Sequence, residues 1–319
     1  MKDSQIYYSI GALLYCPANN EGIVKSITQE RFGDKYSMAL CLEDTISDKH
    51  VEEAEDILAA SLNKIYESMA TKKFYIPKIF VRVRRPEQIQ CLYRKFGKAI
   101  KLVTGFIIPK FDLDNADTYI NEIVSINKVS THKIYMMPIL ESRTIVSIKN
   151  RYDILYTLKD KLDAISDYVL NIRVGGNDLC HAFGFRRRMD ESIHQIGPIA
   201  DILSDVVTVF GMDYVVSGPV WEYYNGDDWE KGFITELKHD RLIGIVGKTV
   251  IHPNQIKYVN EAYKVSKDDY EDARSILNWD SSSSTLVHGG SGKKRMNEYK
   301  THFNWAQRIM FLAEYYGVE

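Results

Sequence analysis

The sequence predicts an α/β protein, a closed (β/α)8 barrel of the TIM type, from three observations. Eight short runs rich in β-branched and aromatic residues occur along the chain. Each run is followed by a longer charged or amphipathic stretch that is typical of a helix. The length of 319 residues suits one barrel of about 250 residues with appendages. An open doubly wound sheet is the alternative that this alternation also allows.

The predicted strands lie in eight apolar runs, at residues 10–18, 37–45, 78–84, 105–111, 133–142, 170–179, 214–220 and 244–253. Several are continuously apolar, as expected for parallel strands that are covered on both faces. Between the second and third runs, residues 51–70 repeat apolar residues at helical spacing, namely Val51, Ala54, Ile57, Leu58 and Ile65. Strand and helix repeated in this way favour a barrel over an open sheet.

The chain after the eighth run divides into three parts. Residues 252–279 have a helical pattern and complete a barrel domain that we place at residues 1–279. Residues 280–294 are rich in Ser and Gly, which predicts a flexible hinge. Residues 295–319 form a C-terminal helix with Phe303, Ala306, Ile309 and Met310 on one face. This helix is either a lid or subunit-swapped segment, or an ordinary packing helix behind a disordered connector.

The composition excludes several classes of protein. A formal charge of -2 provides no basic field for a nucleic acid, so we expect no nucleic-acid partner. No run of 18 apolar residues occurs, so we expect no membrane-spanning helix. The first residues are interpreted as a strand rather than a signal peptide. Four widely spaced cysteines fit reduced thiols, so a cytoplasmic location is expected.

Acidic residues close two neighbouring predicted strands. The active site of a (β/α)8 barrel lies at the C-terminal ends of its strands. Glu141 closes the fifth run and Asp178 closes the sixth, so the two can converge. Mg²⁺ is commonly held by one or two carboxylates together with water and substrate oxygens. We therefore predict that they bind Mg²⁺ or Mn²⁺, whereas helix capping is the alternative for each.

Other polar residues end on the same predicted rim. Glu43 and Asp44 follow the second run and are candidates to hold the waters around the metal. Arg82 lies in the third run, where an inward guanidinium would bind a substrate carboxylate or enolate oxygen, or form a salt bridge to Glu43 or Glu141. Lys110 closes the fourth run.

Two further segments near the sixth predicted strand are of interest, one rich in glycine and one basic. The Gly175-Gly176-Asn177 turn offers backbone N–H groups to an anionic oxygen but lacks GxGxxG spacing. Arg186, Arg187 and Arg188 form a basic run that is interpreted as a solvated loop rather than a phosphate site.

Seven motifs occur in the order seen in a known superfamily, namely CLEDTISD, VRV, GFIIPKFD, PILES, GGNDL, SGP and GKTVIHPNQ. The chain resembles the HpcH/HpaI aldolase and citrate lyase β-subunit superfamily from about residue 10 to residue 276. That resemblance implies a barrel enzyme that cleaves or forms carbon–carbon bonds in 2-hydroxy or 3-hydroxy acids and acyl-CoA substrates. A weaker resemblance is to divergent barrel lyases encoded beside tellurium-resistance genes.

The resemblance implies roles for residues on the predicted rim. Glu141 and Asp178 match the metal ligands, and Arg82 matches the arginine that contacts substrate oxygens. The other matched positions are catalytic or substrate-binding, namely Glu43, Asp44, Lys110, Gly175, Gly176, Asn177 and Pro219. The family implies a homotrimer or hexamer in which the C-terminal segment closes a neighbour's site.

The chain departs from the family pattern in three places. Residues 16–20 lack the Gly and basic residue that usually follow the first strand, and Arg84 replaces the Asn of VRVN. Both changes speak against a CoA thioester as substrate. The C-terminal Asp-Gly-Lys-Met motif is replaced by residues 292–298, so the catalytic aspartate of that motif is missing and Glu298 is a candidate to replace it.

We therefore expect a metal-dependent carbon–carbon lyase or aldolase that acts on a small 2-oxo or hydroxy carboxylic acid, or its thioester, through a metal-stabilised enolate. Arg82 would stabilise the oxyanion. The candidate bases are a metal-bound hydroxide held by Asp44 and the carboxylate of Glu298. The alternatives are a Schiff-base aldolase that uses Lys110 and a non-catalytic barrel that serves as a binding or scaffold subunit.

Overall fold

The computed structural model describes residues 2–280, 282 and 284–319. Eight parallel strands form one sheet in the order β7-β6-β5-β4-β3-β2-β1-β8. An isolated parallel bridge between Gly218 and Lys248 joins β7 to β8 and brings the two ends of the sheet together. The strands are β1 Ala12–Pro17, β2 Ser37–Cys41, β3 Lys78–Arg82, β4 Val103–Ile108, β5 Tyr135–Leu140, β6 Ile172–Val174, β7 Val216–Ser217 and β8 Lys248–Val250. The predicted barrel is confirmed, and each apolar run contains or overlaps one strand.

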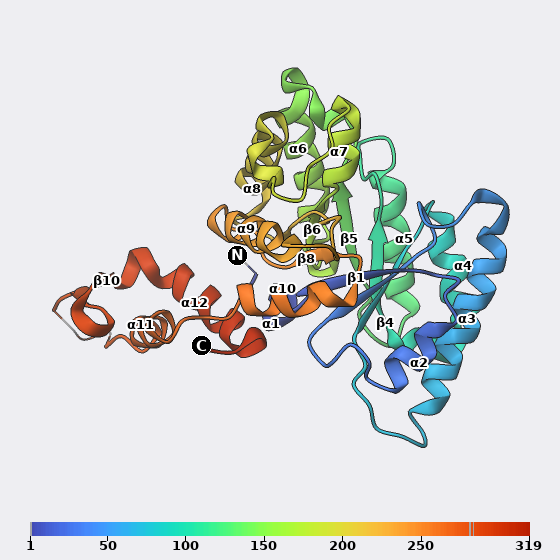
Figure 1. Ribbon diagram of the computed structural model, residues 1–319, viewed down its shortest axis with the longest axis horizontal. Coiled ribbons are helices and arrows are strands. Elements are labelled where there is room, and N and C mark those ends of the chain that lie inside the picture. The colour runs from blue at the N-terminus through green and yellow to red at the C-terminus, as the bar shows by residue number, and fades with distance from the viewer. Residues whose placement is uncertain (1, 281, 283) are drawn as a thin grey trace.

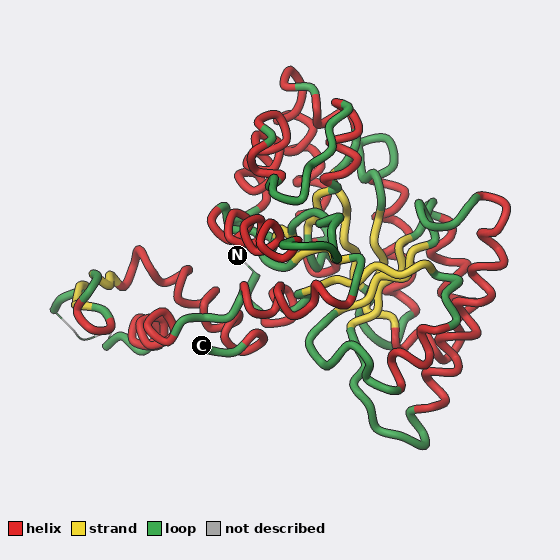
Figure 2. Tube along the Cα trace, viewed as in Figure 1, coloured by secondary structure: helices red, strands yellow, loops and turns green. Residues whose placement is uncertain are grey.

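Helices surround the sheet, and the strands gather at the centre (Figures 1 and 2). The helices of the barrel domain are α1 Gln5–Tyr8, α2 Gly22–Thr28, α3 Val51–Ser68, α4 Glu87–Phe96, α5 Ala116–Val129, α6 Ile148–Asp163, α7 Gly176–Phe183, α8 Gly197–Phe210, α9 Trp229–Leu242 and α10 Ile256–Ala262. Short 3₁₀ helices lie in the connections, namely η1 Asp48–His50, η2 Gly97–Leu102, η3 Arg143–Val146, η4 Ser166–Tyr168, η5 Ile193–Gln195 and η6 Pro253–Gln255.

The apolar patterns explain why these elements form. All five residues of β2 are buried, as a strand covered by helices outside and by packed side chains inside must be. In α3, Ala54, Leu58 and Ile65 are buried, so the predicted helical face is the one that packs on the sheet. No helix among the described residues is long and apolar enough to cross a bilayer.

The C-terminal part of the chain forms an extension that projects from the barrel (Figure 1). It consists of α11 Lys267–Leu277, α12 Tyr299–Tyr316 and a hairpin of β9 Val287–Gly289 and β10 Met296–Glu298. Ala273 and Ile276 of α11 cluster with Ala306, Ile309 and Met310 of α12. Three of the four residues predicted to share a face therefore pack together.

The predicted hinge at residues 280–294 contains ordered elements in its second half. β9 and the 3₁₀ helix η7 Ser291–Lys293 lie within it. Residues 281 and 283 lie outside the described residues, and the flexibility of this segment stays a prediction.

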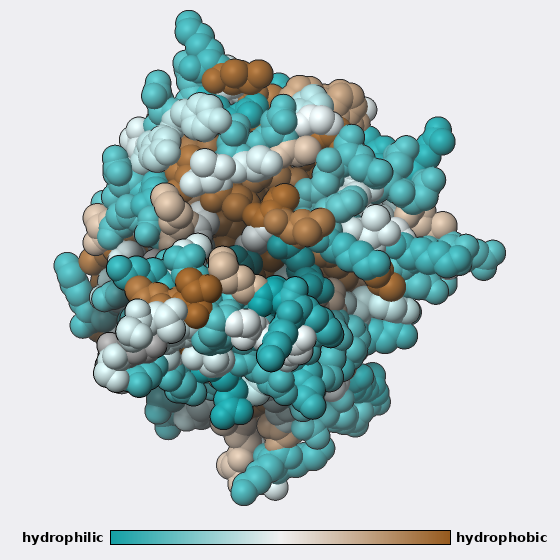
Figure 3. Space-filling view, turned by 90° about the vertical axis from the view of Figure 1, so that its left-hand side faces the viewer, coloured by the Kyte–Doolittle hydropathy of each residue, from teal (hydrophilic) through white to brown (hydrophobic). Residues whose placement is uncertain are grey.

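The extension is joined to the barrel at the amino-terminal ends of the strands. The Tyr316 hydroxyl donates to the Tyr8 carbonyl at 3.5 Å, and Arg308 Nη2 donates to the Gly244 carbonyl at 2.7 Å. Both carbonyls precede a strand, β1 and β8 respectively. Figure 3 views this side of the molecule and shows an apolar hollow ringed by hydrophilic residues. The opposite end of the barrel, where the predicted site residues lie, is therefore not covered by the chain's own extension.

Candidate active site

Arg82 is the last residue of β3 and joins three carboxylates. Its Nη2 atom lies 2.8 Å from Glu43 Oε2, 3.1 Å from Asp44 Oδ2 and 3.2 Å from Glu141 Oε1. The acids follow β2 and β5, so side chains from three strands meet at the carboxyl end of the barrel. The sequence left two roles open for Arg82, namely the binding of a substrate oxygen and a salt bridge to Glu43 or Glu141. The structure shows salt bridges to both acids.

Lys110 follows β4 and completes this cluster. Its Nζ atom lies 2.6 Å from Glu43 Oε1 and 3.5 Å from Asp44 Oδ1, and its backbone N–H donates to Glu141 Oε1 at 2.9 Å. Partial burial opposes the charge of the amine, but the hydrogen bond to Glu43 and the nearby acids raise its pKa. A Schiff-base mechanism needs a neutral lysine, so these contacts disfavour that role for Lys110.

Glu141 is buried, and its two carboxylate oxygens have different surroundings. Oε1 accepts the hydrogen bonds from Arg82 and Lys110. Oε2 faces Gly175, where a Cβ atom would lie 1.9 Å from it. Burial, together with the negative charge of Asp178, raises the pKa of Glu141 to about 7 against the opposing effect of Arg82. The structure thus brings the two predicted metal ligands close enough for their charges to repel.

Asp178 lies in the first turn of α7, two residues after Gly176. Its carboxylate forms no hydrogen bond or ion pair with any residue that the structure describes. The N-cap position of α7 is Gly175, and no side chain caps this helix. The capping alternative is therefore not seen for Asp178, and its oxygens remain available for a ligand.

The glycines of the turn are required by close packing. A Cβ on Gly176 would lie 2.7 Å from Pro219 Cβ and 2.6 Å from Ile193 Cδ1. Gly175, Gly176 and Pro219 therefore lie together beside Glu141, and their role in substrate binding stays a prediction. Asn177 is exposed next to them. The first backbone N–H groups of a helix have no helical partners, so this turn presents donors toward the rim.

The donor atoms of this rim fit a hard divalent cation. Glu141 Oε2 and the Asp178 carboxylate are oxygens of two mutually repelling acids, and a cation between them would offset that repulsion. Across residues 2–280, 282 and 284–319, no group of three or more His, Cys, Asp or Glu side chains is arranged to hold a metal ion. The two ligands predicted from the sequence would need water and substrate oxygens to complete the coordination of Mg²⁺.

Glu298 is not brought to this rim within one chain. It lies in β10 of the extension, where its backbone N–H donates to His302 Nδ1 at 3.0 Å. The extension is joined to the amino-terminal end of the barrel. Glu298 can contribute to catalysis only at the site of another copy.

The basic run at residues 186–188 is not uniformly solvated, and the interpretation as a solvated loop is wrong for Arg187. Arg187 is buried with an ion pair to Glu236, and its Nη2 donates to the Val220 carbonyl at 2.6 Å. Arg186 and Arg188 are exposed. The buried acid on α9, distant in sequence, explains the difference.

Two residues of the barrel interior were not identified from the sequence. Arg173 of β6 is only 2% exposed, and its Nη2 donates to Thr249 Oγ1 at 2.6 Å. Tyr15 of β1 acts electrostatically on both Arg82 and Arg173. A single arginine inside the apolar run at residues 170–179 was the available signal, because a charged residue is rare in a buried strand.

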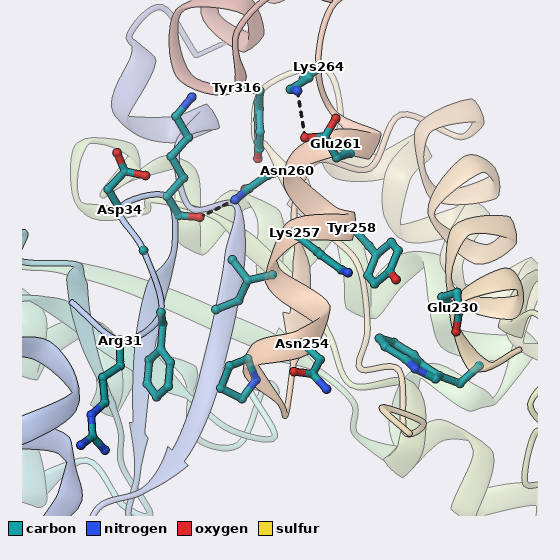
Figure 4. Close-up of a pocket in the computed structure, with 16 residues that line it drawn as sticks. Arg31, Asp34, Glu230, Asn254, Lys257, Tyr258, Asn260, Glu261, Lys264 and Tyr316 are labelled. Atoms are coloured by element: carbon teal, nitrogen blue, oxygen red, sulfur yellow. Dashed lines mark hydrogen bonds and ion pairs between the residues drawn. The ribbon is translucent and has the colours of Figure 1, made fainter. Parts of the chain in front are cut away.

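A separate cavity of about 730 Å³ lies away from the rim, between the segment before β2 and α10 (Figure 4). Within it, Lys264 pairs with Glu261 at 2.8 Å, and the Asn260 amide nitrogen donates to the Lys35 carbonyl at 2.9 Å. None of the predicted site residues lines this cavity. This cavity is therefore separate from the predicted site.

The comparison with protein families agrees with this geometry. A family described as C–C bond lyase of the TIM-barrel fold matches residues 4–318. The chain belongs to this C–C bond lyase family. This match confirms the predicted resemblance to barrel enzymes that cleave or form carbon–carbon bonds, and solved citrate lyase structures share the fold. Among curated proteins, none matches the sequence.

Three solved structures illustrate the shared fold of the lyase. A citrate lyase from Burkholderia xenovorans has 13% identity and a TM-score of 0.73, and the match covers 97% of this chain and 93% of that one. CitE from Mycobacterium tuberculosis, in complex with magnesium, acetoacetate and coenzyme A, has 16% identity and a TM-score of 0.60 over 97% and 99%. The citrate lyase beta subunit from the same organism, with oxaloacetate and magnesium, has 15% identity and a TM-score of 0.52 over 82% and 99%. At such identities the likeness shows the fold.

Proposed function

We propose that this C–C bond lyase family member is a metal-dependent lyase or aldolase that acts on a small 2-oxo or hydroxy carboxylic acid, or on its thioester. The observation that carries the proposal is the cluster of Glu43, Asp44 and Glu141 around the guanidinium of Arg82. Asp178 is near enough for its charge to raise the pKa of Glu141. Two acids and one fixed cation at a single rim match an ion-assisted reaction on an anionic substrate.

The expected ion is Mg²⁺ or Mn²⁺, held by Glu141 and Asp178. When bound, it would supply a Lewis acid that polarises a substrate oxygen. The M. tuberculosis proteins are complexed with magnesium together with oxaloacetate or acetoacetate, which supports the same class of ion and ligand here. Lys110 contributes by holding Glu141 Oε1 through its backbone N–H, which leaves Oε2 directed to the Gly175 turn.

The remaining residues would serve the bond cleavage. As the carbon–carbon bond breaks, one fragment keeps the electron pair and forms an enolate. Arg82 would provide a fixed positive charge near the oxygen of that enolate. Burial opposes ionisation of Asp44, but its hydrogen bond with Glu43 and the charges of Arg82 and Lys110 lower its pKa. Asp44 is therefore ionised at neutral pH and is a candidate to accept the proton, directly or through water. Glu298 from a neighbouring copy is the second candidate.

Arg84 supports these acids from the side where the family pattern differs. Its Nε donates to the Leu42 carbonyl at 2.6 Å, and its Nη2 donates to the Glu43 carbonyl at 2.7 Å. These bonds hold the segment that carries Glu43 and Asp44. Since Arg84 is engaged in this way, a CoA thioester is a less favoured substrate than a free acid. A cytoplasmic homotrimer or hexamer completes the proposal, with no membrane or nucleic-acid partner.

The decisive experiment measures Mg²⁺ binding and cleavage of a panel of 2-oxo and hydroxy acids. Chelation should abolish cleavage, and E141Q and D178N should each lower Mg²⁺ affinity and kcat/KM by at least roughly 100-fold, because each removes a ligand charge. D114N is the matched control, since Asp114 is an exposed acid on the segment just after β4, and it should behave like the wild type.

Two results would count against the proposal. Cleavage that persists in chelator would exclude the metal reaction. Mg²⁺ binding without cleavage of any acid in the panel would favour the non-catalytic scaffold instead.

A further inference from the structure

Arg173 is a buried cation without a counter-ion. Its side-chain partners are neutral groups, namely Thr249 Oγ1 at 2.6 Å, Asn171 Oδ1 at 3.5 Å and the hydroxyl of Tyr15. No acidic residue in the described part of the chain forms an ion pair with it. Arg82, by contrast, has three carboxylate partners. Buried charges in proteins are normally paired, so an anionic partner is expected for Arg173.

The neighbours of Arg173 do not supply the missing negative charge. Burial lowers the pKa of Arg173, and the charge of Arg82 adds to that effect, while Tyr15 opposes it. Burial also raises the pKa of Tyr15, so Tyr15 remains a neutral hydroxyl and does not supply a negative charge. In addition, Arg82 Nε is buried and has no hydrogen-bond partner among the described residues. Within the described residues, Arg173 thus lacks an anionic partner, and the neighbouring Arg82 has one N–H group, at Nε, that lacks an acceptor.

This place is continuous with the proposed active site. Tyr15 responds to the charges of Arg82, Arg173 and Glu141, which puts it between the rim and the interior. Lys248 points outward to Glu236 of α9, so the next residue of β8, Thr249, points into the barrel. Tyr15 and Thr249 both keep some solvent exposure, although the strands around them are buried. A ligand that contacts Tyr15 and Thr249 would therefore also meet Arg173.

We propose that Tyr15, Arg82, Arg173 and Thr249 form a subsite for a second carboxylate of the substrate. This inference rests on the proposed function. It places one carboxylate of the substrate next to Glu141 and Asp178 and the second carboxylate, at the other end of the substrate, in the subsite. The guanidinium fork of arginine matches a planar carboxylate, and two hydroxyl donors complete the coordination. The substrate is thus a short dicarboxylic 2-oxo or hydroxy acid, and Arg173 determines that specificity.

Malate and lactate of the same configuration test the subsite, because both are 2-hydroxy acids and only malate has a second carboxylate. Calorimetric titration in the presence of Mg²⁺ should show that the wild type binds malate roughly 10- to 100-fold more tightly than lactate, as expected for a charge-assisted contact. R173M should reduce malate affinity to the level of lactate and leave lactate affinity unchanged. R186M is the matched control, because Arg186 is exposed outside the barrel, and it should keep the wild-type ratio.

Two further variants keep the test valid if R173M does not fold. T249V and Y15F each remove one hydroxyl at nearly constant volume and should lower the preference for malate by roughly 3- to 10-fold. A wild type that binds malate no better than lactate, or binds neither, would overturn the proposal. An unchanged ratio in R173M and T249V would also overturn it.

The failure of this subsite can be distinguished from the failure of the proposed function. E141Q should weaken malate and lactate equally, since both share the acid group beside the metal ligands. If E141Q has no effect while R173M removes the preference for malate, the metal centre is wrong and the subsite stands. If E141Q weakens both acids while R173M changes neither, the metal centre stands and the subsite is wrong.

Discussion

At the residue scale, the orientation of Glu141 depends on the absence of a side chain at one position. A Cβ on Gly175 would lie 1.9 Å from Glu141 Oε2 and 2.5 Å from Glu141 Cβ. No real Cβ fits at such distances, so any larger residue must displace the carboxylate or the turn. The glycine thus serves the site by permitting close approach, not by adopting an unusual backbone conformation.

G175A therefore tests whether Glu141 is a metal ligand without changing any charge. We expect Mg²⁺ affinity and kcat/KM to fall at least tenfold, because a displacement of about 1 Å in a catalytic group is enough for a loss of this size or larger. Calorimetry and steady-state kinetics measure the two quantities. G197A is the control, since Gly197 begins α8 and a Cβ there meets nothing within 4 Å. Equal losses in both variants, or none in G175A, would contradict the assignment.

At the element scale, buried ion pairs join α9 to β8 and to the segment after α7. Glu236 of α9 contacts Lys248 of β8 at 2.6 Å and also pairs with Arg187. Asp240, one turn later, contacts Lys248 at 2.7 Å and His194 Nε2 at 2.7 Å. These contacts fix the segment that precedes α8 against the eighth strand. Breaking a buried pair leaves an uncompensated charge, which costs about 3–5 kcal/mol.

The Glu236 pairs predict how stability depends on pH. Burial opposes the ionisation of Glu236, but the charges of Lys248 and Arg187 lower its pKa from an ordinary 4.5 to about 2. A lowered folded-state pKa means that the unfolded chain binds the proton first, so this contribution is complete above about pH 4.5 and is lost as the pH falls toward 2. E236Q should lower the free energy of unfolding at pH 7 by several kcal/mol and flatten its decline between pH 4.5 and 2.

Denaturant unfolding across this pH range measures both effects. E53Q provides the comparison, because Glu53 is an exposed acid on α3 and its removal should change neither the stability nor the slope appreciably. If E236Q kept the steep wild-type decline, other carboxylates would be responsible for the acid sensitivity.

At the scale of the whole molecule, the extension combines firm attachment at its base with an apolar tip. Leu312, Ala313 and Tyr316 of α12 belong to the main hydrophobic core. At the far end, the β9–β10 hairpin exposes Val287 by 44% and Met296 by 56%. Exposed apolar residues on a projecting element indicate a contact surface. This arrangement supports the proposed trimer or hexamer, in which the extension of one copy contacts the next.

The double variant V287D/M296D should dissociate such an oligomer, because the interface would have to bury two carboxylates. Light scattering coupled to size-exclusion chromatography would then give the monomer mass, with the barrel still folded. L242D is the control, since Leu242 of α9 is 81% exposed but lies outside the hairpin, and it should keep the wild-type mass. A monomeric wild type would refute the predicted assembly.

The sequence by itself determined the barrel and most of its rim. Each strand carries its own apolar run, and Glu43, Arg82, Lys110 and Glu141 each lie at or just beyond the end of one. Because all parallel strands of a barrel point the same way, residues at their ends must share one rim. These features follow from local sequence patterns, so they could be predicted from the sequence alone.

Only the tertiary structure decided which groups lack partners and which lie apart. Arg173 is unpaired because no acid among the residues that the structure describes forms an ion pair with it, whereas Arg187 is paired because α9 places Glu236 beside it. Glu298 is separated from the rim because the extension is joined to the opposite end of the barrel. These outcomes depend on packing between segments far apart in the chain, for which no local pattern exists.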